Sequence, residues 1–207
     1  MFADRTDAGR RLAAELLDYR DAADTVVFGI PRGGVIVAAE VAAALHLPLD
    51  VALAAKVGAP GNVEYAIGAV GADGVVVTGA HTGHTPADIE ALAAEARAKL
   101  TRGLSLWSAG HPARVPRGGT AILVDDGLAT GLTARAAADW LHRAGAARVI
   151  VAVPVASPEA AQEMRAYAEE VVAIEAPAGF FAVGQVYGRF EQTTDAEVQA
   201  ALSLYRR

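Results

Sequence analysis

The sequence of 207 residues contains no cysteine. That absence excludes disulfides, zinc sites built from thiolates and cysteine nucleophiles, and it is typical of proteins of the reducing cytoplasm. Long apolar runs are also missing, because no stretch approaches the ~18 uninterrupted apolar residues of a membrane span. The charged residues close behind Met1 would interrupt the apolar core of a signal peptide. We therefore expect a soluble, cytoplasmic protein with no membrane partner.

Positive charge is in short supply as well. Lys and Arg number 18 against 24 Asp and Glu, so the formal net charge is -6 and the pI is about 5.3. A general electrostatic attraction to nucleic acid is therefore disfavoured, and we expect no nucleic-acid partner. Internal repeats and low-complexity linkers are missing too. With 53% hydrophobic residues, the chain is long enough to bury the core of one domain.

The apolar runs that are present are short, rich in Val and Ile, and alternate with Ala- and Leu-rich stretches of helical period. This pattern predicts an α/β fold, a doubly wound and mainly parallel sheet flanked by helices. The five candidate strands are Thr25 to Ile30, Leu49 to Ala55, Thr120 to Val124, Arg148 to Val153 and Val171 to Ile174. The expected helices are Asp7 to Leu17, Gly34 to Leu45, Pro86 to Leu106, Gly131 to Ala144, Pro158 to Ala168 and Asp195 to Tyr205.

One segment departs from this alternation. Ala66 to Val70 and Gly74 to Thr78 flank Gly71-Ala-Asp, and two strand-like runs around such a turn predict a β-hairpin. We expect residues 1–207 to form one domain with three parts, namely a core over about 22–175, a flap over about 56–85, and a small cap from the chain ends, chiefly 176–207.

The most informative run is Thr120-Ala-Ile-Leu-Val-Asp125-Asp126-Gly127-Leu-Ala-Thr130-Gly131-Leu-Thr133. An apolar strand ends in two carboxylates and passes through small residues into a helix, and ligands of open α/β sheets bind at this edge. The helix start offers unpaired N–H groups to a phosphate. The carboxylates would repel that phosphate unless they bind hydroxyls or a metal, and ribose and Mg²⁺ meet this need. The alternative is an ordinary loop in which Thr130 is the N-cap and the aspartates cap backbone amides.

The full run resembles the phosphoribosyl diphosphate (PRPP) motif of type I phosphoribosyltransferases almost position for position. The resemblance implies that Asp125 and Asp126 contact the ribose 2- and 3-hydroxyls, directly or through hydrated Mg²⁺. It also implies a 5-phosphate site made of Ala129, Thr130, Gly131, Leu132 and Thr133. Hypoxanthine-guanine enzymes of the family usually carry an aspartate where this chain has Ala129. That departure argues against a 6-oxopurine acceptor without naming the true one.

A second turn follows the first expected strand, in Phe28-Gly29-Ile30-Pro31-Arg32-Gly33-Gly34. Its glycines allow backbone amides to converge on an anion, and Arg32 offers a charged fork to phosphate oxygens. By itself the run is equally compatible with a tight turn that exposes Arg32. Its placement resembles the family's pyrophosphate loop, whose peptide can be cis, and this implies pyrophosphate binding by Pro31, Arg32, Gly33 and Gly34.

Three further groups of residues are candidates for the site. Lys56, after the second expected strand, is either a pyrophosphate ligand or a solvated surface lysine. A flap that excludes water from a reactive sugar cation is implied at Asn62, Glu64 and Tyr65. An aromatic, glycine-rich segment either stacks on a planar base or packs inside the cap, and its candidate stacking residues are Phe181 and Tyr187.

His81 and His84 lie three residues apart, a spacing that is compatible with a metal site. No nearby carboxylate or third histidine completes a set of ligands. We therefore interpret this segment as a polar loop.

The resemblance implies an enzyme that transfers a phosphoribosyl group from PRPP to a nitrogenous base or related acceptor and releases pyrophosphate. Mg²⁺ would be its cofactor, and the catalytic residues would be Arg32, Lys56, Asp125 and Asp126. We expect no covalent nucleophile, because positioning and charge stabilisation can supply the rate. The expected partners are small-molecule substrates, and a homodimer is left open.

Two alternatives to this enzyme stay open at the level of the sequence. The first is a regulatory protein that binds PRPP or a nucleotide without turnover. The second is another phosphate-binding α/β enzyme, such as one that uses a dinucleotide. The second is weakened because neither glycine turn matches the Gly-x-Gly-x-x-Gly pattern of dinucleotide-binding proteins.

Overall fold

A five-stranded parallel sheet forms the centre of the protein, with the strand order β2-β1-β6-β7-β8. The structure is a computed structural model that describes residues 1–79, 83–108, 112–180 and 182–205. The strands are β1 (Thr25–Gly29), β2 (Leu49–Val51), β6 (Thr120–Val124), β7 (Arg148–Val155) and β8 (Glu170–Glu175). All four neighbouring pairs are parallel. The expected α/β class and its parallel sheet are confirmed.

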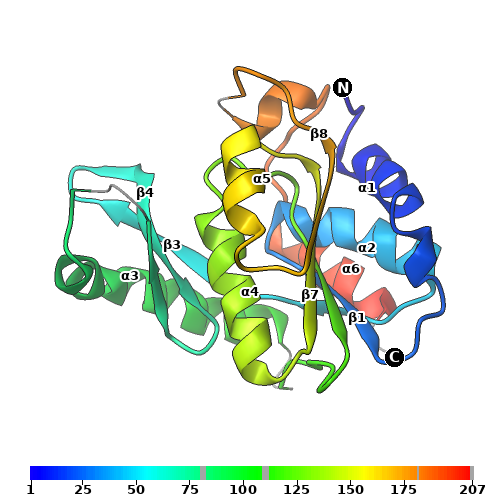
Figure 1. Cartoon of the computed structure of the whole chain (residues 1–207), viewed down its shortest axis with the longest axis horizontal. Helices are drawn as coiled ribbons and strands as arrows, with labels where there is room; N and C mark the ends of the chain where they lie inside the picture. Colours follow the sequence, from blue (N-terminus) through cyan, green and yellow to red (C-terminus); the bar gives the residue numbers. More distant parts are fainter. Residues whose placement is uncertain (80–82, 109–111, 181, 206–207) are drawn as a thin grey trace.

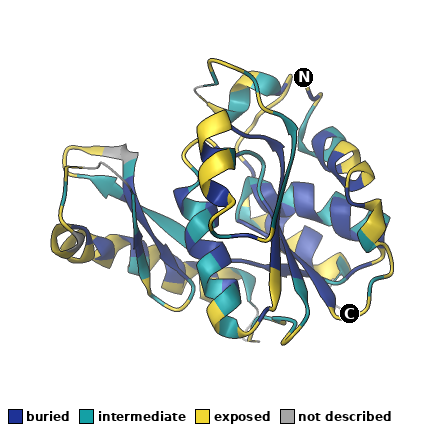
Figure 2. Cartoon of the chain, viewed as in Figure 1, coloured by how far each residue is buried: buried dark blue, intermediate teal, exposed yellow. Residues whose placement is uncertain are grey.

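Helices cover both faces of this sheet (Figure 1). One face packs against α1 (Arg5–Ala14), α2 (Gly33–Leu45) and α6 (Asp195–Tyr205), and the other against α4 (Leu132–Ala144) and α5 (Pro158–Met164). Alternate strand residues point to opposite faces, so Val27 and Ile122 belong to the first cluster while Phe28 and Leu123 belong to the second. Strands β1, β2, β6 and β7 are therefore buried on both sides, which explains their uninterrupted apolar runs, whereas the edge strand β8 is half-buried (Figure 2).

A second, antiparallel sheet consists of β3 (Ala54–Ala59), β4 (Asn62–Gly71) and β5 (Val76–Thr78), and α3 (Pro86–Trp107) packs along it. The predicted β4–β5 hairpin is confirmed. The strand predicted from Leu49 to Ala55 is wrong in its second half, because β2 ends at Val51 and the chain then enters β3. An apolar run looks the same in sequence whether it stays in one sheet or crosses to another. Lys56 consequently lies inside β3, opposite Ala69, and not at the end of a core strand.

The antiparallel sheet stands apart from the parallel sheet and rests against α4 (Figure 1). Ala69 and Val77 of this sheet form a small buried cluster with Leu132 and Ala136 of α4. At the β4–β5 turn, the carboxylate of Asp73 accepts hydrogen bonds of 2.7 and 3.2 Å from Arg143 of α4. The base of the hairpin is therefore fixed to α4.

The N-terminal residues lie beside the orange segment of Figure 1, which precedes α6 in the sequence. The Phe2 amide donates a 2.7 Å hydrogen bond to Val186, and the Gly188 amide donates a 2.8 Å bond to Phe2. We call residues 1–5 and 182–193, which include the 3₁₀ helix η2 (Val183–Val186), the terminal cap. Another 3₁₀ helix, η1 (Leu17–Tyr19), follows α1.

Helix boundaries otherwise follow the local capping signals. Helix α1 begins two residues before the predicted start, because the side chain of Asp4 caps it by accepting a hydrogen bond from the Asp7 amide. Helix α3 begins at Pro86, and Thr85 and Asp88 form a capping box there. Within the described part of the chain, no helix combines the length and apolar character needed to cross a membrane.

Candidate active site

Two carboxylates lie directly after β6, at the edge of the parallel sheet where its strands end. The amide of Asp126 donates a 2.8 Å hydrogen bond to Oδ1 of Asp125, and only 16% of the Asp126 side chain is exposed. Burial, and then the charge of Asp126, raise the pKa of Asp125 well above its usual value. Burial also raises the pKa of Asp126, although Arg5 opposes this effect. Such a pair favours a ligand that supplies a cation or hydroxyl donors.

The Pro31 to Gly34 turn lies directly against these carboxylates. Strands β1 and β6 are neighbours, with Gly29 opposite Val124, so both turns leave the sheet at the same edge. A Cβ atom on Gly33 would lie 1.9 Å from Oδ2 of Asp126, and one on Gly34 would lie 2.8 Å from Oδ1 of Asp125. Glycine is therefore required for this close approach. The peptide bond between Pro31 and Arg32 is cis.

The turn after the carboxylates leads into α4 without a side-chain cap. Gly131 is the N-cap, at φ 71°, and no side chain of the described residues bonds to the helix start. The interpretation of Thr130 as N-cap is therefore wrong, and Thr130 is exposed. Ser157 holds the turn in place by donating a 3.0 Å hydrogen bond to the carbonyl of Ala129. The first amides of α4 are thus available to an anion.

The two predicted basic residues belong to different elements of the structure. Nη1 of Arg32 is 3.7 Å from a carboxylate oxygen of Asp195, at the start of α6, and the Arg32 side chain is 36% exposed. Lys56 projects from β3 of the antiparallel sheet. A pyrophosphate role for either residue stays a prediction.

Several other predicted site residues lie in or near the antiparallel sheet. Asn62, Glu64 and Tyr65 belong to the first part of β4, and the side chains of the last two lie outside what the structure describes. Phe181 and His81 also lie outside the described residues. Their roles stay predictions.

Tyr187 is buried in the terminal cap, with 7% of its surface exposed. The centroid of its ring lies 5.5 Å from that of Phe2 and 5.0 Å from that of Phe190. Its hydroxyl donates a 2.7 Å hydrogen bond to the backbone carbonyl of Asp126, and burial foremost raises its pKa. Tyr187 therefore packs inside the cap, which was the alternative to stacking on a base. Little of its ring is open to such a ligand.

Arg5 is a site residue that the sequence analysis missed. Its Nε lies 2.8 Å from Oδ2 of Asp126, and its Nη1 donates a 2.7 Å hydrogen bond to the carbonyl of Glu191. The guanidinium lies 4.0 Å from the centre of the Phe190 ring, and 13% of the side chain is exposed. A separation of 121 positions between Arg5 and Asp126 leaves no spacing signal in the sequence. Only the tertiary structure brings this cation to the carboxylates.

A metal at this edge would depend on the two carboxylates. Among the described residues, no group of three or more His, Asp or Glu side chains could hold a metal ion. Mg²⁺ is commonly held by one or two carboxylates, with water and substrate phosphates completing its coordination. Asp125 and Asp126 therefore fit a magnesium ion whose remaining ligands are water molecules and, when a substrate is bound, its phosphate oxygens.

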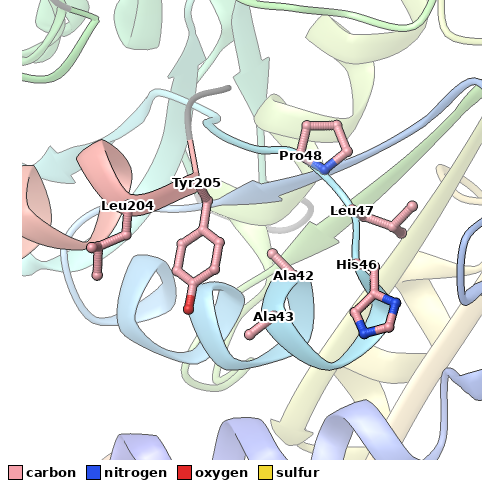
Figure 3. A pocket seen from close by; sticks show the side chains of 7 residues that line it. All are labelled: Ala42, Ala43, His46, Leu47, Pro48, Leu204 and Tyr205. Carbon is pink, nitrogen blue, oxygen red and sulfur yellow. The ribbon is translucent and has the colours of Figure 1, made fainter.

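A hollow of about 530 Å³ lies elsewhere, between the C-terminal ends of α2 and α6 (Figure 3). Its lining residues are Ala42, Ala43, His46, Leu47, Pro48, Leu204 and Tyr205. Leu47 and Pro48 come directly before β2, so the hollow is at the opposite edge of the sheet from the carboxylates. It takes no part in the site described above.

The parallel sheet flanked by helices defines a phosphoribosyltransferase-type fold. The profile of the phosphoribosyl transferase domain matches residues 3–188, so the chain belongs to this family. The resemblance to the type I members is confirmed.

Two curated relatives carry names from the same family. Two Mycobacterium tuberculosis proteins, from strains CDC 1551 and H37Rv, carry names that assign them provisionally to the phosphoribosyl transferases. Each is 44% identical over 214 residues, which cover 100% of this chain and 47% of the relative. The chain thus spans about half the length of these relatives.

Solved structures show the same fold. The protein TT1426 from Thermus thermophilus has a TM-score of 0.82 and 43% identity, and the match covers 99% of this chain and 98% of that one. A purine phosphoribosyltransferase from Pyrococcus horikoshii has a TM-score of 0.51 at 18% identity, with 94% of this chain and 96% of that one covered. The second match supports the fold alone.

Proposed function

We propose that the protein transfers the 5-phosphoribosyl group of PRPP to a nitrogenous acceptor and releases pyrophosphate. The observation that carries this proposal is the contact between the two turns, in which Gly33 approaches Oδ2 of Asp126 so closely that a Cβ would overlap it. Two anion-binding turns on one carboxylate pair suit a ligand with a phosphate at one end, a diphosphate at the other and ribose between them. Family membership supports a phosphoribosyltransferase.

Each end of the donor has a matching group in the protein. The uncapped start of α4 offers its amides to the 5-phosphate, with Thr130 and Thr133 adding hydroxyl donors. Asp125 and Asp126 would accept hydrogen bonds from the ribose hydroxyls or hold Mg²⁺. When bound, Mg²⁺ would neutralise charge on the diphosphate. The amides of Arg32, Gly33 and Gly34 would bind the departing pyrophosphate, and the partly exposed side chain of Arg32 could reach it.

The reaction is a displacement at the anomeric carbon of ribose. The bond from that carbon to the diphosphate oxygen breaks, a bond to the acceptor nitrogen forms, and the acceptor loses a proton. Ala129 places a methyl group where a general base would be needed for a 6-oxopurine, so we propose an acceptor of another kind. The protein would accelerate the displacement by positioning the reactants and stabilising charge.

The proposal is tested by incubating the protein with PRPP, Mg²⁺ and a panel of bases while pyrophosphate and nucleotide are measured. We expect pyrophosphate and one nucleotide to appear in equal amounts. The doubly substituted variant Asp125→Asn, Asp126→Asn should lose donor affinity and turnover, because amides cannot replace both carboxylates. Donor binding without turnover across the panel would instead support a protein that senses PRPP, and unchanged donor affinity in the variant would refute the site.

A further inference from the structure

The ion pair between Arg5 and Asp126 places a cation of the protein itself on a carboxylate of the proposed donor site. Nε of Arg5 lies 2.8 Å from Oδ2 of Asp126, and both side chains are largely buried, at 13% and 16% exposed. The same guanidinium lies against the Pro31 to Gly34 turn, because a Cβ atom placed on Gly33 would be 2.6 Å from Nε of Arg5. Arg5 therefore occupies the junction of the carboxylates and the turn.

A divalent cation bound directly to Oδ2 of Asp126 would compete with this guanidinium for the same oxygen. Mg²⁺ binds carboxylate oxygens at about 2.0–2.1 Å, so an N–H donor at hydrogen-bond distance from Oδ2 stands in its path. Two cations on one buried carboxylate also repel each other, and partial burial strengthens that repulsion relative to water. Arg5 and a directly bound metal are thus alternative partners of Asp126.

The structure also has space for a second position of the Arg5 side chain. A cavity of about 310 Å³ lies next to it, and its charged lining residues are Asp4, Arg5, Arg189, Glu191 and Glu197. Arg189 is already paired with Asp4. A water molecule occupies about 30 Å³, so the cavity has room for a guanidinium group. Glu191 and Glu197 provide carboxylates that could pair with the group there. The Nη1 bond to the Glu191 carbonyl already points the side chain toward this part of the terminal cap.

We propose that Arg5 controls access of the metal to Asp126, pairing with the carboxylate in the ligand-free protein and moving into the adjacent cavity when a divalent cation binds. This inference rests on the proposed function, because it assigns the carboxylates to a metal and its donor. Arg5 is then a gating residue of the donor site, contributed by the first turn of the chain's first helix. Arg5 also contacts Phe190 and Glu191 of the terminal cap. Metal binding at Asp126 would therefore change the contacts that Arg5 makes with the cap.

The test is titration of Mn²⁺, without donor, followed by electron paramagnetic resonance of the free ion. Arg5→Gln should bind Mn²⁺ about tenfold more tightly than wild type, a change that corresponds to the loss of one charge-assisted hydrogen bond. Arg5→Lys keeps the competing charge and should stay near wild type. The matched control is Arg10→Gln on the same helix, where Arg10 pairs with Glu40 on the surface at 3.1 Å, and its Mn²⁺ affinity should not change.

A second variant keeps the test decisive if Arg5→Gln fails to fold. Glu197→Gln removes one carboxylate of the cavity while its amide oxygen can still accept the hydrogen bond from the Thr194 amide. We expect weaker Mn²⁺ binding, because the guanidinium loses a partner in its second place. Unchanged affinity in Glu197→Gln, or unchanged or weaker affinity in folded Arg5→Gln, would overturn the inference.

Calorimetric titration of the same proteins with PRPP and Mg²⁺ separates this inference from the proposed function. If PRPP binds but the Mn²⁺ affinity is the same in wild type and in the Arg5 and Glu197 variants, only the role proposed for Arg5 is refuted. If PRPP binds to none of the proteins, the proposed function fails, and the inference fails with it.

Discussion

The hydroxyl of Tyr187 donates a 2.7 Å hydrogen bond to the backbone carbonyl of Asp126. Arg5 also forms an ion pair with the Asp126 side chain. These two contacts connect the terminal cap to Asp126, which we propose binds the ribose of PRPP or a metal ion. Both contacts come from chain segments that are remote in sequence from β6. The position of Asp126 therefore depends on how the two ends of the chain pack.

Replacement of Tyr187 by Phe tests this connection. The variant removes the hydroxyl, leaves the Asp126 carbonyl without that donor, and should lower the free energy of unfolding by about 1–2 kcal/mol. Urea unfolding measures the change. Donor affinity should fall with it, because Asp126 loses a restraint. Tyr205→Phe, at the far end of α6, is the control and should alter neither quantity; a stability loss in Tyr187→Phe with wild-type donor affinity would contradict the connection.

A substitution at Thr130 distinguishes a role in phosphate binding from a role in helix capping. Because Gly131 and not Thr130 is the N-cap of α4, Thr130→Ala should change the free energy of unfolding by less than about 0.5 kcal/mol. Calorimetry should show weaker PRPP binding, since one hydroxyl donor is lost. Ser157→Ala is the reference for a lost helix cap: Ser157 caps α5 by accepting from the Ala160 amide at 3.0 Å, so its removal should cost about 1 kcal/mol. Only stability is compared in this variant, because Ser157 also bonds to the carbonyl of Ala129 in the phosphate turn. A clear stability loss in Thr130→Ala would argue for the capping role.

Gly33→Ala tests the contact between the two turns. The added methyl would overlap Oδ2 of Asp126 at 1.9 Å, so the turn or the carboxylate must move. We expect a loss of about 1–3 kcal/mol in stability, as for overpacked sites, and a loss of PRPP affinity measured by calorimetry. Gly74→Ala is a useful comparison, because its φ of 80° makes alanine strained while no atom lies within 4 Å. That variant should lose stability and keep its donor affinity.

The ion pair between Asp73 and Arg143 gives a pH-dependent prediction. Burial acts to raise the pKa of Asp73, but hydrogen bonds from Arg143 and the Val75 amide outweigh it and leave the pKa below its ordinary value of 3.8. The pair therefore stabilises the fold above about pH 4, and this contribution disappears as the pH falls through the folded-state pKa. Arg143→Gln should cost about 0.5 kcal/mol at pH 7, a small value because the pair is partly exposed.

Urea unfolding of wild type and Arg143→Gln at several pH values measures that difference. The two curves should converge in strongly acidic solution, where Asp73 is protonated in both proteins. Glu95 and Lys99 form an exposed pair within α3 and serve as a comparison, since Lys99→Gln should change stability less. A constant difference between wild type and Arg143→Gln across the pH range would contradict the assignment.

Much of the fold could be predicted because its signals are local. The runs that became β1, β6, β7 and β8 are short and apolar, and the helices begin and end near residues with clear capping or turn chemistry. The passage from β2 to β3 was not predictable in the same way. Residues Leu49 to Ala55 are apolar throughout, and periodicity cannot reveal the point at which a strand leaves one sheet for another.

The linear order of residues was enough to locate the proposed donor chemistry. Asp125, Asp126 and the turn to Thr133 are contiguous, so their order predicts carboxylates and a phosphate turn at one sheet edge. The surroundings of these residues became known only from the folded chain. Arg5 and Tyr187 reach Asp126 from opposite ends of the chain, and α4, rather than solvent, supports the hairpin. Contacts between distant segments depend on packing, which local residue patterns do not record.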